Sequence, residues 1–376
     1  MRTPLAWLNL KHRKARTLAA LTGVAMAIML IFLQIGFYRA AFRSAVMILE
    51  QFSFDVVLVS PQYVYLRQSG SISRSRLYQA LAADGVAWTS PLYLGVARAQ
   101  LPGTHARREV AVVGVDPANM PWSRPAYARA ARNLSTLDTV MLDTKTGPGY
   151  ETLHRGQVIE LDGHRVTIAA DYAHGPGFTG SAALVAGDLT YARIFGLADR
   201  DAVSIGLVGL QDGADPDSVA ARLRALLPAD VRVLTRRQLV RSEQNWSINV
   251  KPVGIMFTSG VLLAFIVGAV ILYQILATEI INNLREYATL RAMGCTTFDL
   301  NLLVWKQAVL YSVLGFIPAA ILSTLIYIMI DSTTTLPTEM TVGKLSAVFI
   351  LVTIMCLLAG TAAVRKVSRA DPADLF

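Results

Sequence analysis

The chain has 376 residues, 53% of them hydrophobic, and a formal net charge of +9. This composition is too apolar for an ordinary soluble protein and predicts an integral membrane protein. The positive charge does not indicate nucleic-acid binding, because basic residues are mixed with acidic ones and form no run interleaved with aromatics. The two cysteines, Cys295 and Cys356, both lie in the last third of the sequence, so they offer no disulfide to the region before them.

Four uncharged runs are each long enough to cross a hydrocarbon core of about 30 Å, which takes about 20 helical residues. They are 17–38, 253–278, 307–330 and 345–364. We therefore expect an α-helical membrane protein with four transmembrane helices in a one-plus-three order. Residues 39–252 then form a large α+β domain between the first and second helices. A signal peptide is the alternative for the first run, but that run exceeds the usual apolar segment of about 7–15 residues.

Basic residues precede the first run, and no acidic residue accompanies them. By the positive-inside rule the N-terminus is expected in the cytoplasm, and an even number of spans returns the tail, 365–376, to the same side. Residues 39–252 and the loop 331–344 are then extracytoplasmic. Residues 1–16 suit an amphipathic helix lying on membrane lipid, and a simple positive-inside anchor is the alternative. The anchoring residues are Trp7, Lys11, Arg13, Lys14 and Arg16.

The region between the first two spans has a mixed α/β pattern. Helical spacing continues from the first span to Phe54 and returns at 235–249, which predicts two helical stalk legs. The segment 121–132 has no clear period and is expected to be a loop. A small α+β sandwich carrying an insertion fits this order. We expect strands near 55–60, 86–100, 108–116, 140–143, 157–171 (with a tight turn at Asp162-Gly163), 203–210 and 231–234, and helices at 73–84 and 217–227.

The second span carries Gly260, Ala264 and Gly268, a small-residue stripe that lets another helix approach closely. The stripe can serve packing within one subunit or form a dimer seam, and both readings stay open. The third span contains Gly315 and Pro318, where we expect a bend whose freed carbonyl is satisfied by neighbouring groups.

Signatures of chemistry are sparse. The Gly-rich run 175–181 lacks the lysine of a phosphate-binding loop. His154, His164 and His174 recur at intervals of ten without the short-range partner of a metal site. The predicted spans hold no charge, which argues against a proton-relay transporter. We expect no catalytic group, no metal and no cofactor in this chain.

The polar stretch 278–294 between the second and third spans is short and helix-prone. Its charged residues fall on neighbouring turns opposite an apolar face, and Gly294 offers a left-handed helix stop. We therefore expect a stiff helix at the inner surface, within a loop spanning 279–306, that contacts a partner. Ordinary solvated side chains of an inner loop are the alternative.

The sequence R-E-Y-A-T-L-R-A-M-G, residues 285–294, resembles the coupling-helix motif of the FtsX/MacB/LolC family of ABC-transporter permeases. It departs from the commoner pattern at Tyr287 and Ala288, where Ile-Gly is usual. The opening P-L-A-W-L-N-L and the tail R-A-D-P-A-D-L-F are similar to those of DevC-type permeases. The resemblance implies that the segment docks on a separate ATPase subunit, which binds ATP and magnesium. The coupling residues are then Arg285, Glu286, Thr289, Leu290, Arg291, Ala292 and Gly294.

The resemblance implies a permease subunit of an ATP-driven exporter in a bacterial inner membrane, transmitting ATPase motion to a periplasmic domain. Its implied partners are a second permease copy, a DevA-like ATPase, a DevB-like membrane-fusion adaptor and a TolC-like outer-membrane channel, with a glycolipid or other amphiphile as cargo. An FtsX-like regulator of a cell-wall hydrolase and a LolC-like lipoprotein-releasing subunit are alternatives. A membrane enzyme is a third, and it would need a cluster of catalytic groups that the sequence does not display.

Overall fold

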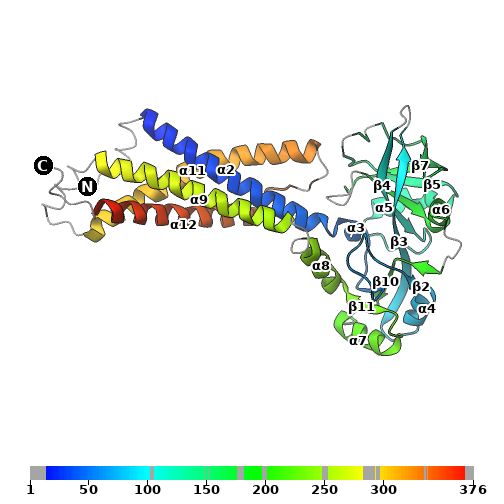
Figure 1. Cartoon of the computed structure of the whole chain (residues 1–376). Helices are drawn as coiled ribbons and strands as arrows, with labels where there is room; N and C mark the ends of the chain where they lie inside the picture. Colours follow the sequence, from blue (N-terminus) through cyan, green and yellow to red (C-terminus); the bar gives the residue numbers. More distant parts are fainter. Residues whose placement is uncertain are drawn as a thin grey trace. The chain divides into compact units, whose positions relative to one another are not determined.

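The computed structural model divides the chain into two compact units (Figure 1). Unit 1 contains Met1–Arg39, Gly254–Met329 and Thr338–Phe376, and unit 2 contains Ala40–Val253 and Ile330–Pro337. The residues that the structure describes are 14–101, 106–147, 149–150, 152–175, 182–196, 201–247, 253–282, 293, 297–333, 336 and 338–368.

Unit 1 contains the four long apolar helices. They are α2 (Lys14–Ser44), α9 (Val253–Asn282), α11 (Thr297–Thr333) and α12 (Val342–Ser368). The stretches long and apolar enough to cross a membrane are Leu21–Ser44, Gly254–Asn282, Val304–Asp331 and Val342–Arg365. The four predicted spans and their one-plus-three order are confirmed. Each helix runs past its predicted apolar run, because polar residues at the ends continue the helix.

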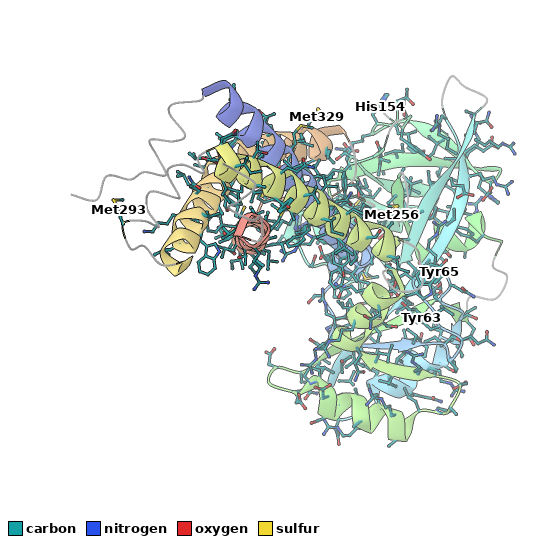
Figure 2. All side chains as sticks on the ribbon, turned by 60° about the vertical axis from the view of Figure 1, so that its left-hand side comes forward. Tyr63, Tyr65, His154, Met256, Met293 and Met329 are labelled. Atoms are coloured by element: carbon teal, nitrogen blue, oxygen red, sulfur yellow. The ribbon has the colours of Figure 1, made fainter. Side chains whose placement is uncertain are left out.

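The helices of unit 1 are apolar on the inside and on the outside. Buried side chains such as Ile28, Leu272 and Met355 form a common core. Side chains on the opposite faces are exposed and equally apolar, including Met256 at 58% and Met329 at 61%, both labelled in Figure 2. A helix that is hydrophobic all round fits a lipid environment and not a surface in water.

Unit 2 is built on one sheet with helices against it. Its elements are α3 (Met47–Glu50), β1 (Val56–Val59), β2 (Ile72–Ser73), α4 (Ser75–Leu81), β3 (Val86–Gln100), β4 (Arg107–Val115), α5 (Pro125–Ala130), a 3-10 helix (Ala131–Ser135), β5 (Thr139–Asp143), β6 (Val158–Leu161), β7 (His164–Tyr172), β8 (Ala183–Gly187), α6 (Asp188–Ile194), β9 (Ala202–Val203), β10 (Ile205–Leu210), α7 (Pro216–Leu226), β11 (Arg232–Thr235) and α8 (Arg236–Asn245). The strand order is β11-β1-β10-β3-β4-β8-β5-β7-β6, and β2 pairs with β9 separately.

Strand β3, the long cyan strand in Figure 1, joins two parts of this sheet. Its first half pairs with β10, with Thr89 opposite Val208, and its last residues pair with β6, with Ala99 opposite Leu161. Because β6 is also connected to β4 through β7, β5 and β8, six strands close into a barrel. Strands β10, β1 and β11 extend from β3 as an open sheet. The expected sandwich is therefore replaced by a barrel with an open extension.

Alternating side chains fill the barrel, as the period of two along a strand requires. Val112, Leu142, Ile168 and Leu184 are buried in one core cluster together with residues of α4, α6 and α7. The other face of the sheet carries a second cluster, to which α3, α5 and α8 contribute. Unit 2 thus has a core on each side of its sheet.

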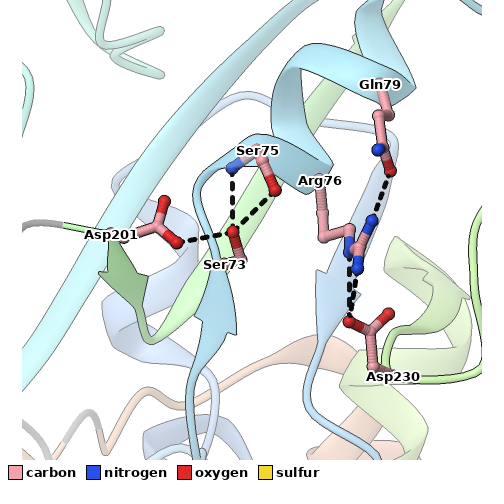
Figure 3. A network of polar contacts seen from close by, with 6 residues as sticks. All are labelled: Ser73, Ser75, Arg76, Gln79, Asp201 and Asp230. Atoms are coloured by element: carbon pink, nitrogen blue, oxygen red, sulfur yellow. Dashed lines mark hydrogen bonds and ion pairs between the residues drawn. The ribbon is translucent and has the colours of Figure 1, made fainter.

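An exposed polar network fixes α4 to its neighbours (Figure 3). Ser73 Oγ donates to Asp201 at 2.7 Å, and the Arg76 guanidinium contacts Asp230 at 2.7 Å. Ser73 is the last residue of β2 and accepts the N–H of Ser75, the first residue of α4, so the first contact connects the start of α4 to the residue before β9. The second connects α4 to the turn before β11. The side chains of the network are Ser73, Ser75, Arg76, Gln79, Asp201 and Asp230.

Two sequence predictions for this region are wrong. The expected loop 121–132 contains α5, which has Pro125 in its first turn and only Tyr127 buried, so it is too short to show a helical period. The first stalk leg is not continuous to Phe54, because α2 ends at Ser44 and the backbone leaves the helical region at Val46 before α3.

Candidate functional site in the helical bundle

The small-residue stripe of α9 packs against helices of the same chain. A Cβ added at Gly260 would lie 2.5 Å from Cδ of Gln34 in α2, and one added at Gly268 would lie 2.8 Å from Sδ of Met355 in α12. Ala264, between them, is fully buried. The stripe therefore allows α9 to approach its own neighbours closely. A dimer seam stays a prediction, and a second copy that packs tightly on α9 would meet another face of the helix.

Helices α2 and α11 meet at a second glycine. The Tyr327 hydroxyl donates to the Phe32 carbonyl oxygen, and a Cβ at Gly36 would overlap the Tyr327 ring. Tyr327 therefore inserts where α2 has no side chain. Helix α11 continues through Pro318. These contacts make the bundle a set of interlocked helices.

A carboxylate lies inside the last turns of α9. Glu279 accepts hydrogen bonds from the Tyr311 hydroxyl at 3.2 Å and from Gln307 Nε2 at 3.5 Å, both on α11. Gln307 is 1% exposed. The prediction of spans without charge needs correction, because the apolar helix runs to Asn282 and includes Glu279. An ionisable residue at such a position marks a functional site by default.

The predicted boundary of the inner loop is also too wide. Helix α9 ends at Asn282 and α11 begins at Thr297, so the connection is 283–296 and not 279–306. Met293, the described residue of this connection, is 69% exposed. The outer loop likewise shortens, since α11 ends at Thr333 and α12 begins at Val342.

The predicted coupling residues lie outside the described part of the chain. They are Arg285, Glu286, Thr289, Leu290, Arg291, Ala292 and Gly294. Trp7, Lys11 and Arg13 of the predicted anchor lie outside it too, whereas Lys14 and Arg16 are placed as backbone in the first turn of α2. Both roles stay predictions.

The three spaced histidines stand on separate segments of unit 2. His174 uses both ring nitrogens in hydrogen bonds: Nε2 donates to the Met47 carbonyl oxygen at 2.7 Å, and Nδ1 accepts from the Tyr127 hydroxyl at 3.0 Å. His154 precedes β6, and His164 begins β7. Within the described ranges, no group of three His, Cys, Asp or Glu side chains could hold a metal ion.

Asp143, at the end of β5, is a buried carboxylate that the sequence analysis did not single out. It accepts backbone N–H groups from Lys145 at 3.0 Å, His174 at 3.1 Å and Gly175 at 2.7 Å. Burial raises the pKa of Asp143, and the three backbone hydrogen bonds oppose this rise. Asp143 thereby connects the segment after β5, at Lys145, to the segment after β7, at His174 and Gly175.

The arrangement defines a multi-pass membrane protein with a large α/β domain between its first and second spans. Residues 246–372 match the family of FtsX-like permease C-terminal domains. The match starts directly after α8 and covers α9, the connection 283–296, α11 and all of α12. This part of the chain is similar to FtsX-like permease C-terminal domains.

Comparison with curated proteins finds no match. Solved structures similar to the chain include the extracellular domain of the noncanonic ABC-type transporter YknZ from Gram-positive bacteria, at 11% identity and a TM-score of 0.34, covering 48% of this chain and 98% of that one. The periplasmic region of MacB from Actinobacillus actinomycetemcomitans has 9% identity and a TM-score of 0.36, with 53% and 96% covered. A domain of a putative permease protein from Porphyromonas gingivalis has 12% identity and a TM-score of 0.31, with 49% and 92% covered.

Proposed function

We propose that this protein is the permease subunit of an ABC exporter in which a separate ATPase subunit binds ATP and magnesium and drives the permease. The observation that carries the proposal is the FtsX-like permease match over 246–372, which coincides with the last three of the four apolar helices. The position of the predicted coupling segment, between α9 and α11, supports it.

A force applied to the coupling segment can be transmitted along the helices on both sides of it. It joins two helices of 30 and 37 residues, about 45 Å and 55 Å long at 1.5 Å per residue. A displacement of 283–296 therefore acts on the ends of two long rods. The interlocked contacts at Gly36 and Gly268 favour movement of whole helices over local bending. In this proposal Arg285, Glu286 and Arg291 face the ATPase.

Chain connectivity joins the segment 40–253 of the outer domain to a span at each of its ends. Helix α2 enters unit 2 at Ala40, and the chain passes from α8 to α9 between Asn245 and Val253. A push on the coupling segment reaches unit 2 along these connections, and no substrate passage through the bundle is needed. The basic flanks of α2 and α12 support an orientation with both termini in the cytoplasm and unit 2 in the periplasm of a bacterial inner membrane.

The finer assignment rests on the DevC-like ends of the sequence. In this assignment the permease forms a homodimer, works with a DevA-like ATPase, a DevB-like adaptor and a TolC-like channel, and exports a glycolipid or another amphiphile. The tail R-A-D-P-A-D-L-F is the sequence feature that supports it.

The test exchanges the charges of Arg285 and Glu286 in the full-length protein. Copurification of the ATPase subunit and nucleotide-dependent export are measured in membranes. The matched control is Arg129→Glu, an exposed position of α5 in unit 2. We expect the exchange to abolish ATPase binding and export, and the control to leave both unchanged.

Normal ATPase binding by the exchanged variant would refute the docking role. If the ATPase binds the wild type but no export depends on it, and cell-wall hydrolysis changes instead, the FtsX-like regulatory function replaces export. Capture of the DevB-like adaptor by unit 2 separates export from both regulation and lipoprotein release.

A further inference from the structure

The C-terminal end of α8 is held by the loop 60–70, which follows β1. Glu243 of α8 is 3% exposed, and its carboxylate accepts the Tyr63 hydroxyl at 2.5 Å and the Leu66 backbone N–H at 3.2 Å. One turn later the ring of Trp246, which caps α8, stacks on Tyr65 at 3.6 Å between centroids and 8° between planes. Tyr63 and Tyr65 are labelled in Figure 2. Two contacts from one loop thus meet one face of the helix.

The loop has a defined shape of its own. The Val64 N–H donates to the Gln68 carbonyl oxygen at 3.1 Å, and the Gln68 N–H donates to the Tyr65 carbonyl oxygen at 2.8 Å. Gly70 closes the loop with a φ of +65°, and a Cβ there would lie 2.8 Å from the Ser60 side chain. Only glycine fits this closure. The loop therefore presents Tyr63 and Tyr65 in fixed positions.

The N-terminal end of α8 is held by the residues that precede β1. The Arg236 N–H donates to the Asp55 carbonyl oxygen at 2.8 Å, and the Arg236 guanidinium lies 4.6 Å from the centre of the Phe54 ring. Thr235 and Gln238 add a reciprocal capping box. Both ends of α8 are thus attached to segments that flank the same strand, β1.

The choice of a carboxylate makes the contact specific. Leu239, one turn before Glu243 on the same face, is fully buried, so apolar packing is available there. A buried carboxylate is tolerated only where its oxygens find donors, and the loop supplies the Tyr63 hydroxyl and the Leu66 N–H. Burial, together with the neighbouring Glu243, raises the pKa of Tyr63, so the phenol keeps its proton and stays a donor. The loop 60–70 and helix α8 therefore fit together in one relative position, in which Glu243 meets these donors.

We propose that Glu243 and the loop 60–70 form the joint through which movement of the α8–α9 leg passes to β1 and the sheet of unit 2. This inference rests on the proposed function and names the place where the outer domain receives the movement. Glu243 acts as a positioning residue. Strand β1 is suited to pass the movement on, because it pairs with β10 on one side and β11 on the other.

The test uses the full-length permease with the ATPase subunit that copurifies with it, in detergent or nanodiscs. Hydrogen exchange is measured with and without a non-hydrolysable ATP analogue, in peptides covering α8 and β10. The variants are Tyr63→Phe and Glu243→Gln. Tyr65→Leu is added because it removes the ring stack without stranding a buried charge. The control is Arg237→Ala, also in α8, which breaks the exposed ion pair between Arg237 and Asp217 of α7.

We expect nucleotide to change exchange in both peptides for the wild type and for Arg237→Ala. In the joint variants we expect the change to persist in α8 and to be lost in β10, with ATPase binding unaltered. Persistence of the β10 change in all three joint variants would overturn the joint while leaving the proposed function standing. No nucleotide response in any peptide of the wild type would overturn the proposed function and the joint with it.

Discussion

Replacing Tyr63 by phenylalanine removes one hydroxyl and leaves the ring in place. Tyr63 is 5% exposed and its hydroxyl binds the Glu243 carboxylate, which is 3% exposed. A hydrogen bond to a charged group contributes about 1.5–3 kcal/mol. After the substitution the Leu66 N–H still donates to this carboxylate. We therefore expect the contact between the loop and α8 to weaken by about 2 kcal/mol.

The same substitution at two other buried tyrosines gives values with which the effect at Tyr63 can be compared. The Tyr150 hydroxyl donates to the Glu109 carbonyl oxygen at 2.8 Å, a neutral acceptor, so Tyr150→Phe should cost about 1 kcal/mol. The Tyr172 hydroxyl is buried and, in the described part of the chain, has no partner at hydrogen-bond geometry. Tyr172→Phe should then be neutral or slightly stabilising. The three substitutions remove the same atom from three different surroundings.

Hydrogen exchange of the intact protein in detergent measures the effect locally. A loss of about 2 kcal/mol corresponds to roughly 30-fold faster exchange of the Leu66 amide, since 1.4 kcal/mol is a factor of ten. Peptides around Tyr150 and Tyr172 report the other two variants. The reasoning is refuted if Tyr63→Phe accelerates exchange no more than Tyr150→Phe does.

Three further predictions concern the bundle and a helix cap. Gly268→Leu should lower bundle stability by about 1–3 kcal/mol through overpacking and broaden the size-exclusion profile in detergent. Val267→Leu, at a half-exposed position of the same helix, should do neither. Equal effects of the two substitutions would contradict the packing of Gly268. Glu279→Leu should destabilise the bundle by about 1–3 kcal/mol in thermal unfolding, because it removes the acceptor of the Tyr311 hydroxyl. Glu279→Gln should retain most of the wild-type stability. A Gln variant less stable than the Leu variant would be incompatible with the contact. Hydrogen bonds from the first turn of α7 lower the pKa of Asp215 below 3.8, so the stability contributed by its ionised form is complete above pH 3.8 and is lost as the pH falls through the folded-state pKa. Asp215→Asn keeps a cap without the charge, and acid-unfolding curves that superimpose for the two proteins would disprove this.

Local chemistry made much of the fold predictable. Strand β3 has the predicted bounds, because its alternating pattern is long and interrupted by few turn residues. The turn at Asp162-Gly163 is confirmed, with φ of 44° and 90°, as the left-handed conformation of such a turn requires. Helix α7 begins at Pro216 after the Asp215 cap, which the Asp-Pro pair indicates.

Long-range pairing was beyond this kind of prediction. Closure of the barrel depends on Ala99 meeting Leu161, and neither residue carries a local sign of the other. Helix α8 looks like a solvated polar helix, and the partner that Glu243 meets on burial, Tyr63, lies 180 residues away in the sequence. The sequence places Glu279 in a loop because the uncharged run ends at 278, whereas helix α9 continues to Asn282. The coupling residues were identified from a resemblance and stay a prediction.

Strand β11 is the edge strand of the open sheet, and its free edge bears on aggregation. Among the described strands, β11 pairs with β1 on one side only. Arg224 of α7 reaches this border and donates from Nε and Nη2 to the Val233 carbonyl oxygen, both at 3.1 Å. A guanidinium at that oxygen occupies an acceptor that an incoming strand of a neighbouring molecule would need. The opposite border offers no such template, since β6 is joined to β3. With its edge protected in this way, unit 2 can be present at high density without strand pairing between neighbouring molecules.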